Sequence, residues 1–271
     1  MASSRRSALL NANQCNEPIV NDFDHWKKTI DYLKTTIFHI TQYKAGSQWI
    51  YHILRRCDSE RIVPPKLGVS HFVEDPIVQG RIYPTVYVTR EVYERTRKPM
   101  NSAYFIILRD LRDILVSAYF SVKYSHPLLN DRMAKARQEL FGRNVEDGYI
   151  WLMENWLSQS ADIGRSWVQN GEEWIRYEDL LIDDVGILER ALIDRCRLGI
   201  DRRIFRDAVL ECRSAKLSGG RMRGEEDPKS HTRKGVSGDW KVHFTSKVIS
   251  EFKDRFGDLL IRSGYIDHND W

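Results

Sequence analysis

The sequence predicts an α/β fold in a single domain, with a central parallel sheet flanked by helices. Two observations come from the order of segments: a short apolar segment, a glycine turn and an amphipathic helix follow one another near the N-terminus, and a similar unit recurs downstream. The third is composition, because 42% of the 271 residues are hydrophobic and 11% aromatic, which suffices for a sizeable core without disulfides.

The first unit lies close to the N-terminus. Residues 1–21 are polar and aperiodic, so we expect them to form an N-terminal extension of a domain that spans 22–271. Apolar residues at helical spacing predict a helix over 23–33, and the β-branched run T-T-I-F-H-I-T predicts a buried strand over 35–41. After the turn Q-Y-K-A-G-S, the apolar spacing predicts a helix that ends at about Arg56.

The second unit begins with A-Y-F-I-I-L, which predicts a strand over 103–108 that is buried on both faces. Asp110 is placed to cap a following helix, and the apolar stripe of that helix continues to Val122. The remaining expected elements are a long helix over 149–167, a strand over 173–177, helices over 184–197 and 201–212, a loop over 214–239 and a last helix after Thr245.

Charge and cysteine content narrow the class of protein. The chain has 42 Lys and Arg against 38 Asp and Glu, and this net charge of +4 fits an anionic small ligand at least as well as a nucleic acid. No apolar run approaches a membrane span, and no apolar leader follows the first arginines, so we expect a soluble cytoplasmic protein. The four cysteines form no C-x-x-C pair, so we expect free thiols and no metal site.

A first candidate motif is T-Q-Y-K-A-G-S-Q-W, residues 41–49, between the first strand and its helix. Such a turn presents unpaired backbone amides at a helix N-terminus, where an oxyanion binds favourably. Gly46 allows close approach to a ligand, and Lys44 supplies a mobile cation. The alternative is an ordinary turn with a surface lysine. The G-x-x-x-x-G-K-S/T nucleotide loop is excluded, because the lysine precedes the single glycine.

A second candidate motif follows the strand over 103–108. Arg109 stands at the carboxyl end of that strand, where α/β sheets bind ligands, and Ser117 lies eight residues further on. A guanidinium group and a hydroxyl group together can hold a phosphate. The alternative is an ion pair between Arg109 and Asp113 at the start of the helix.

A third candidate motif, R-K-G-V-S-G-D-W-K at residues 233–241, ends the long loop. Two adjacent cations followed by Gly235 can bring charge and backbone donors onto one phosphate. The alternative is a solvated run of charges.

Together these motifs resemble the cytosolic-type sulfotransferases that use 3′-phosphoadenosine 5′-phosphosulfate (PAPS). The family loop Y-P-K-S-G-T-T-W is similar to residues 43–49, with Lys44, Gly46 and Trp49 kept. The family's Arg and Ser eight residues apart match the second motif, and its R-K-G-x-x-G-D-W-K matches the third in full. Its Y-E-D-L is present from Tyr177. The resemblance covers about 35–265 and implies a P-loop-like nucleotide-binding architecture.

The resemblance also implies residue roles in transfer of a sulfuryl group from PAPS to a hydroxyl group or, less commonly, a nitrogen. Lys44 stabilises charge on the departing oxygen, and Trp49 and Tyr177 border the adenine. No metal is expected, because lysine and arginine side chains already neutralise the charge of the leaving group. The backbone amides that cradle the 5′-phosphate belong to Ala45, Gly46, Ser47 and Gln48, and the residues that hold the 3′-phosphate are Arg109, Ser117, Arg233, Lys234 and Gly235.

Several positions depart from the family pattern. Tyr43 replaces the loop proline, and the family's K-T-H histidine is missing about 22 residues before Arg109, where Tyr87 stands. We therefore expect a histidine or carboxylate base from the region 70–95, such as His71 or Glu74, and we interpret His39 as a core residue. The alternatives are Tyr87 as the base, or an acceptor nitrogen or acidic hydroxyl that needs little help from a base. His126 is a further candidate, and Thr85 with Tyr87 is expected to orient the acceptor. The family's dimer signature is only half present, which leaves the oligomeric state open.

The acceptor is expected to be a polar or cationic small molecule, because the segments that would wall its pocket mix aromatic and acidic residues. Those segments are 60–100, 125–146 and 214–232. Two other function classes remain open at this point: a P-loop-type nucleotide kinase and a non-catalytic nucleotide-binding module. The kinase would need a lysine after its second glycine and a neighbouring hydroxyl for Mg²⁺, and the sequence has neither.

Overall fold

Four parallel strands form the sheet, in the order β2-β1-β3-β4. This computed structural model describes residues 34–65, 72, 75–169, 171–213, 220–222, 224–230 and 233–271. The two central strands pair in continuous register, with Ile37 opposite Ala103 and Ile40 opposite Ile106. The strands are β1 (Thr36–Thr41), β2 (Ile82–Val86), β3 (Ser102–Leu108) and β4 (Ile175–Arg176).

The predicted parallel sheet is confirmed, but the sequence did not reveal β2. Pro84 lies within this strand and cannot donate a hydrogen bond, so the segment lacks the pattern of a central strand. The structure tolerates it because β2 is the outermost strand in the sheet order and its pairing with β1 is irregular between Phe38 and Ile40. His39 uses this irregularity, since its Nδ1 lies 2.6 Å from the Pro84 carbonyl oxygen.

The helices follow the predicted order, with some additions. Asp110 caps its helix as expected, by accepting a hydrogen bond from the Arg112 amide. The segment 125–146, which we interpreted as a connection, contains one whole helix and the start of another. The helices are α2 (Ser47–Cys57), η1 (Ser59–Arg61), α4 (Arg90–Arg95), α5 (Leu111–Phe120), η2 (Ser121–Ser125), α6 (Asp131–Phe141), α7 (Val145–Leu152), η3 (Met153–Leu157), α8 (Ser158–Val168), α9 (Tyr177–Leu180), α10 (Asp184–Glu189), η4 (Arg190–Arg195), α11 (Arg202–Glu211), α13 (Trp240–His243) and α14 (Ser246–Arg262).

Helices cover both faces of the sheet, as the flanking segments predicted. Ile37 and Phe105 point to one face and pack with α2, α10 and α11. Phe38 and Ile106 point to the other face, where Trp167 of α8 and Tyr93 of α4 complete the cluster. Successive residues of a strand point to opposite faces, so a strand covered on both faces is buried along its whole length, as β1 is.

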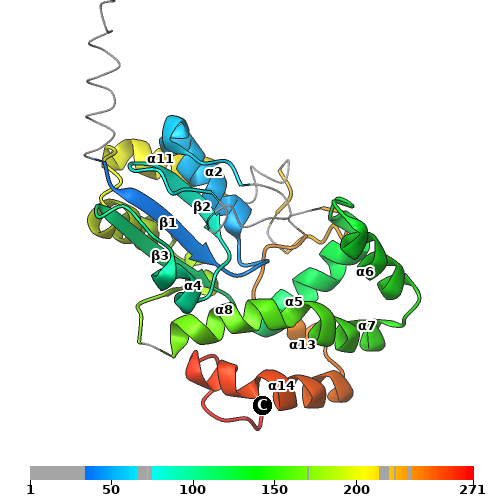
Figure 1. Cartoon of the computed structure of the whole chain (residues 1–271). Coiled ribbons are helices and arrows are strands. Elements are labelled where there is room, and N and C mark those ends of the chain that lie inside the picture. The colour runs from blue at the N-terminus through cyan, green and yellow to red at the C-terminus, as the bar shows by residue number, and fades with distance from the viewer. Residues whose placement is uncertain are drawn as a thin grey trace, which may run out of the picture.

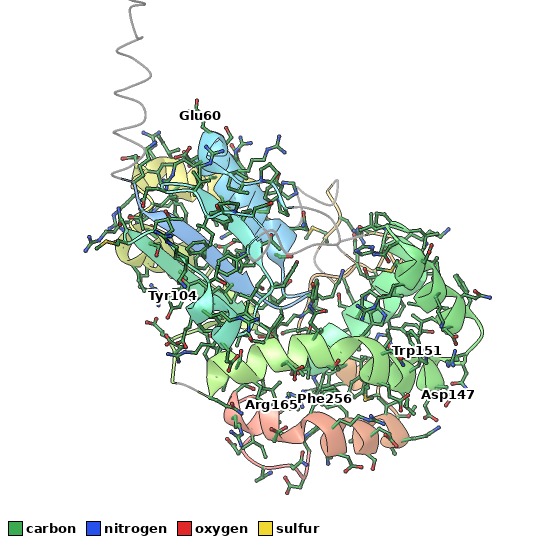
Figure 2. The ribbon with its side chains drawn as sticks, in the orientation of Figure 1. Glu60, Tyr104, Asp147, Trp151, Arg165 and Phe256 are labelled. Carbon is green, nitrogen blue, oxygen red and sulfur yellow. The ribbon has the colours of Figure 1, made fainter. Side chains whose placement is uncertain are left out.

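A third apolar cluster contains no strand and joins α5, α7 and α14 (Figure 1). Helix α14 lies on the side of α8 away from the sheet, and Figure 2 shows Arg165 and Phe256 at the boundary between these two helices. Phe256 belongs to the cluster, and Arg165 pairs with Asp258 at 3.4 Å. The fold therefore places a helical layer beside the carboxyl ends of the strands.

Some expectations concern residues outside the described part of the chain, namely the extension 1–21, the helix over 23–33 and Cys15. Cys57, Cys196 and Cys212 carry free thiols, as predicted. In the part of the chain that the structure describes, no helix has the length and apolar character needed to cross a membrane.

Candidate active site

The loop after β1 has the backbone geometry of an anion-binding turn. Lys44 and Gly46 both adopt left-handed conformations, with φ of 67° and 81°. Gly46 precedes α2 and provides no side-chain cap, so the first amides of this helix remain available to an anion. A Cβ atom at position 46 would lie 2.7 Å from the ring of Tyr177, so this position requires glycine for space as well as for conformation.

The Lys44 ammonium group lies in a cationic environment. Its Nζ donates to the Ser121 hydroxyl at 3.1 Å, and Ser121 begins the π-helical turn η2 that follows α5. Burial, together with repulsion from Arg109 and Arg233, lowers the pKa of Lys44 to about 8. The three predicted motifs therefore meet, because Arg109 of the second motif and Arg233 of the third both act on the Lys44 ammonium group of the first.

Arg109 joins the three motifs directly. Its Nη1 donates to the Lys44 carbonyl oxygen at 3.0 Å, and its Nη2 donates to the Val236 carbonyl oxygen at 3.2 Å. The guanidinium group stacks 4.7 Å from the centre of the Tyr177 ring. Its buried Nε has no hydrogen-bond partner among the described residues, which leaves a donor for a ligand.

The alternative ion pair between Arg109 and Asp113 does not form. Asp113 instead accepts hydrogen bonds from the backbone amides of Gly238 and Trp240, at 2.7 and 3.1 Å. Ser117, the hydroxyl residue of the second motif, is half-buried in α5.

The third motif is an organised strap rather than a solvated charge run. Arg233 pairs with Glu226 and Asp239, and Lys234 pairs with Asp239 at 2.6 Å. The Arg233 side chain is 11% exposed, and its guanidinium group lies 4.4 Å from the centre of the Phe120 ring. Gly235 has a φ of 68°, which favours glycine there.

Two aromatic residues flank the loop on the side of α2. The rings of Trp49 and Tyr177 meet edge to face, 6.4 Å apart. The buried indole Nε1 of Trp49 has no hydrogen-bond partner within the described residues. An apolar wall with one unused donor is suited to a nucleobase.

Of the candidate bases His71, Glu74 and Tyr87, only Tyr87 lies within the described residues. Its hydroxyl lies 2.8 Å from the Ser47 hydroxyl, and its ring stacks on Tyr43 at 3.9 Å. Burial raises the pKa of Tyr87 to about 12, so this phenol is protonated near neutral pH and is a poor base in this state. His71 and Glu74 lie outside the described residues.

The remaining candidates near this region have other contacts. His39 is fully buried, stacks on Phe105 at 4.8 Å and has its pKa lowered by burial to about 4, which confirms it as a core residue. The Nδ1 of His126 lies 2.9 Å from the Pro127 carbonyl oxygen. The Thr85 hydroxyl is buried without a partner in the described ranges.

A hollow of about 360 Å³ lies beside Tyr87, on the side of α8. Gln159 and Asp162 form its polar part, and the Gln159 amide donates to the Tyr43 hydroxyl at 3.5 Å. The other lining residues are Tyr87, Val88, Thr89, Val92, Ser158 and Ile163. No cluster of three or more metal-ligating side chains occurs in the described part of the chain.

Sequence reasoning did not identify Ser121, Asp113 and Asp239 as members of this site. The aspartate of G-D-W was visible in the third motif, but nothing in the spacing indicated that it holds two cations. Ser121 lies in a π turn, whose geometry changes the register of the helix and has no pattern in a single sequence.

Comparisons with known proteins agree with this geometry. The model of the family described as "Sulfotransferase domain" matches residues 34–264. The fold is similar to that of mouse sulfotransferase SULT7A1 complexed with PAP, with a TM-score of 0.58, 20% identity, and 88% of this chain and 89% of that chain covered. The comparison with curated proteins gives no match.

Two further structures are similar in fold, both of retinol dehydratase. The complex with androsterone and inactive cofactor PAP has a TM-score of 0.54 and 15% identity, over 83% of this chain and 80% of that chain. The complex with retinol and PAP has a TM-score of 0.51 and 14% identity, over 83% and 81%. At these low identities the likeness shows the fold, and none of the comparisons supports the nucleotide-kinase alternative.

Proposed function

We propose the reaction of this site from the premise that the chain belongs to the sulfotransferase domain family, whose match spans residues 34–264. The enzyme transfers a sulfuryl group from PAPS to a hydroxyl group of a small acceptor. The acceptor oxygen forms a bond to sulfur while the bond from sulfur to the 5′-phosphate oxygen breaks. That oxygen keeps the electron pair and leaves as part of 3′-phosphoadenosine 5′-phosphate (PAP), and the acceptor proton passes to a base.

The observation that carries this proposal is the position of Arg109. Its side chain donates to Lys44 in the first motif and to Val236 in the third, so groups suited to two separate phosphates lie on either side of it. PAP and PAPS carry such a pair of phosphate groups, at the 3′ and 5′ positions. A nucleoside triphosphate carries its phosphates in one chain and would need only one of these positions.

The proposed roles follow the chemistry of each group. Lys44 neutralises charge on the departing oxygen, a role that needs its protonated form. The amides of Ala45, Gly46, Ser47 and Gln48 cradle the 5′-phosphate, and Trp49 with Tyr177 borders the adenine. The 3′-phosphate is held by Arg109, Ser117, Arg233, Lys234 and Gly235, of which Arg109 and Arg233 lie near Lys44.

The proton acceptor is proposed to come from His71 or Glu74, with Tyr87 and Thr85 orienting the acceptor. The raised pKa of Tyr87 supports an orienting role, because a protonated phenol donates a hydrogen bond and does not take a proton. The Thr85 hydroxyl, which is buried and has no hydrogen-bond partner among the described residues, is a second group that could donate a hydrogen bond to the acceptor.

The acceptor is proposed to be a polar or cationic small molecule. The hollow beside Tyr87 supports this class, because Gln159 and Asp162 offer an amide and a carboxylate next to an apolar floor. The retinol dehydratase structures hold retinol or androsterone, which are apolar by comparison. A cytoplasmic location is part of the proposal, and the free thiols of Cys57, Cys196 and Cys212 are compatible with a reducing compartment.

Binding and labelling together test the function. Purified chain should bind PAP at least tenfold more tightly than ATP with Mg²⁺, measured by calorimetry. With labelled PAPS and a panel of phenols, amines and alcohols, label should reach an acceptor. Lys44→Ala is the negative control, because loss of one group that stabilises the transition state reduces turnover about 100-fold or more. Tighter binding of ATP, or equal labelling by Lys44→Ala, would contradict the assignment.

A further inference from the structure

Asp113 makes long-range hydrogen bonds that the reaction chemistry does not require. Its side chain is buried, and it accepts hydrogen bonds from the amides of Gly238 and Trp240, which lie 125 and 127 residues further along the chain. Burial raises the pKa of this carboxyl group, while Arg109 and the two amides oppose that shift. A buried carboxylate with two backbone amides fixes both segments in place, since an unmade hydrogen bond there is costly.

The two amides flank Asp239, so Asp113 holds the backbone on both sides of that residue. The Asp239 side chain is 3% exposed, and it accepts from Lys234 at 2.6 Å and from Arg233. His243 adds a third contact, with its Nε2 at 3.3 Å. Hydrogen bonds from these groups hold the pKa of Asp239 well below its usual range, against the opposing effect of burial, so it stays charged.

Arg109 and Asp113 lie four residues apart around the N-terminus of α5, so they share one rigid support. Arg109 also donates to the Val236 carbonyl oxygen at 3.2 Å, inside the strap formed by residues 233–240. The strap is thus attached to the start of α5 at two points. These attachments fix the spacing between Arg109 and the pair of cations Arg233 and Lys234.

We propose that Asp113 and Asp239 are positioning residues that set this spacing and thereby give the site its preference for a 3′-phosphorylated nucleotide. The inference rests on the proposed function, because it concerns the 3′-phosphate half of that site. Asp239 pairs with both Arg233 and Lys234 and so keeps these two cations side by side despite their mutual repulsion. Asp113 holds the segment that carries Asp239 in place. Neither carboxylate needs to contact the nucleotide, whose 3′-phosphate meets only the cations.

The test compares adenosine 3′,5′-bisphosphate with adenosine 5′-monophosphate, which differ only in the 3′-phosphate. Asp113→Asn keeps the size of the side chain but turns an NH₂ group toward one of the two backbone amides. Calorimetry should show that the wild type prefers the bisphosphate by 100-fold or more. The variant should lose at least tenfold of that preference and keep its affinity for the monophosphate within about threefold.

Asp184→Asn is the matched control. Asp184 is also a buried carboxylate that accepts a backbone amide and pairs with an arginine, Arg213, but it lies in α10 and outside this site. Its loss should lower the melting temperature and leave the nucleotide preference unchanged. An equal loss of preference in both variants would show that destabilisation alone weakens binding, and the proposal would be wrong.

A double-variant cycle separates this proposal from a purely structural role. Asp239→Asn leaves the Asp113 hydrogen bonds in place and should itself reduce the preference, which keeps the test valid even if Asp113→Asn does not fold. If Asp113 acts through Asp239, adding Asp113→Asn to that variant should change the preference by less than twofold. Additive effects, or a preference unaltered in both single variants, would overturn the proposal. A wild type without any preference would instead refute the proposed function.

Discussion

Lys44 combines an uncommon backbone conformation with a perturbed charge. A left-handed φ of 67° is unfavourable for a lysine, and it directs the residue into a turn whose other positions present backbone amides. Its neighbours Arg109 and Arg233 carry the same charge, so the free site holds excess positive charge around one ammonium group. Such an arrangement is stabilised by a bound anion and destabilised without one.

The lowered pKa of Lys44 predicts how nucleotide binding responds to pH. In the free protein, Lys44 is protonated below about pH 8 and loses its charge as pH rises through that value. PAP affinity should therefore be highest below pH 8 and decline above it, when measured by calorimetry from about pH 7, where the phosphates are already ionised. Lys44→Arg should remove the decline, because a guanidinium group stays charged. A flat wild-type profile up to about pH 9.5 would exclude this role.

Tyr87 leads to a prediction about mechanism. Its hydroxyl is engaged with Ser47 at 2.8 Å and its pKa is raised to about 12, so Tyr87→Phe should remove an orienting contact and leave the base intact. We expect turnover to fall by about tenfold, the size of one lost hydrogen bond, with the same dependence on pH. His71→Ala and Glu74→Gln, measured in parallel, should reveal the base: one of them should remove the rise of turnover with pH. Loss of that rise in Tyr87→Phe instead would make the phenol the base.

At the scale of elements, the sequence predicted the strands and helices whose apolar residues follow one clear periodicity. β1 and β3 are apolar on both faces, and α2 and α14 carry one apolar stripe each, so their patterns needed no tertiary information. β2 was missed because Pro84 is acceptable only at the sheet edge, and edge position is a property of the whole sheet. The motifs of the site were visible in sequence, but the buried Asp113 carboxylate acts through contacts more than a hundred residues apart, which a single sequence does not show.

The junction of β1 and α2 gives a prediction about a single element. Gly46 has a φ of 81°, and a Cβ atom there would lie 2.7 Å from the Tyr177 ring. Gly46→Ala should destabilise the fold by about 1 kcal/mol or more through backbone strain, and should weaken PAP binding at least tenfold by displacing Tyr177. Chemical denaturation and calorimetry measure the two effects.

Gly142→Ala is the control for this change. Gly142 follows α6 with a negative φ, and the nearest atom to an added Cβ lies 3.7 Å away, which is an ordinary contact. This variant should retain wild-type stability and PAP affinity within error. If Gly46→Ala behaved in the same way, the close approach of Tyr177 to the loop would have no energetic consequence.

At the scale of the whole molecule, the site lies where separate parts of the core meet. The loop after β1 belongs to the sheet, Ser121 and Asp113 belong to the helical layer, and the strap at 233–240 leads into α13 and α14. A nucleotide that bound all three would resist their separation during unfolding. Because such a nucleotide binds the folded chain and not the unfolded one, binding should raise the free energy of global unfolding.

This linkage predicts a melting-temperature shift that depends on Arg109. At a PAP concentration of about 100 times Kd, binding should stabilise the fold by about 2.7 kcal/mol. For a chain of this size, this corresponds to a rise of roughly 5–10 °C by calorimetry. Arg109→Ala leaves the phosphate without its bidentate donor, so it should weaken binding by about 2–4 kcal/mol and reduce the shift to about a third or less at the same concentration. Arg165→Ala, on the outer boundary between α8 and α14, should keep the full shift despite losing the pair with Asp258. Equal shifts in Arg109→Ala and the wild type would mean that PAP binds away from the end of β3, because every contact proposed for the 3′-phosphate is organised around this arginine.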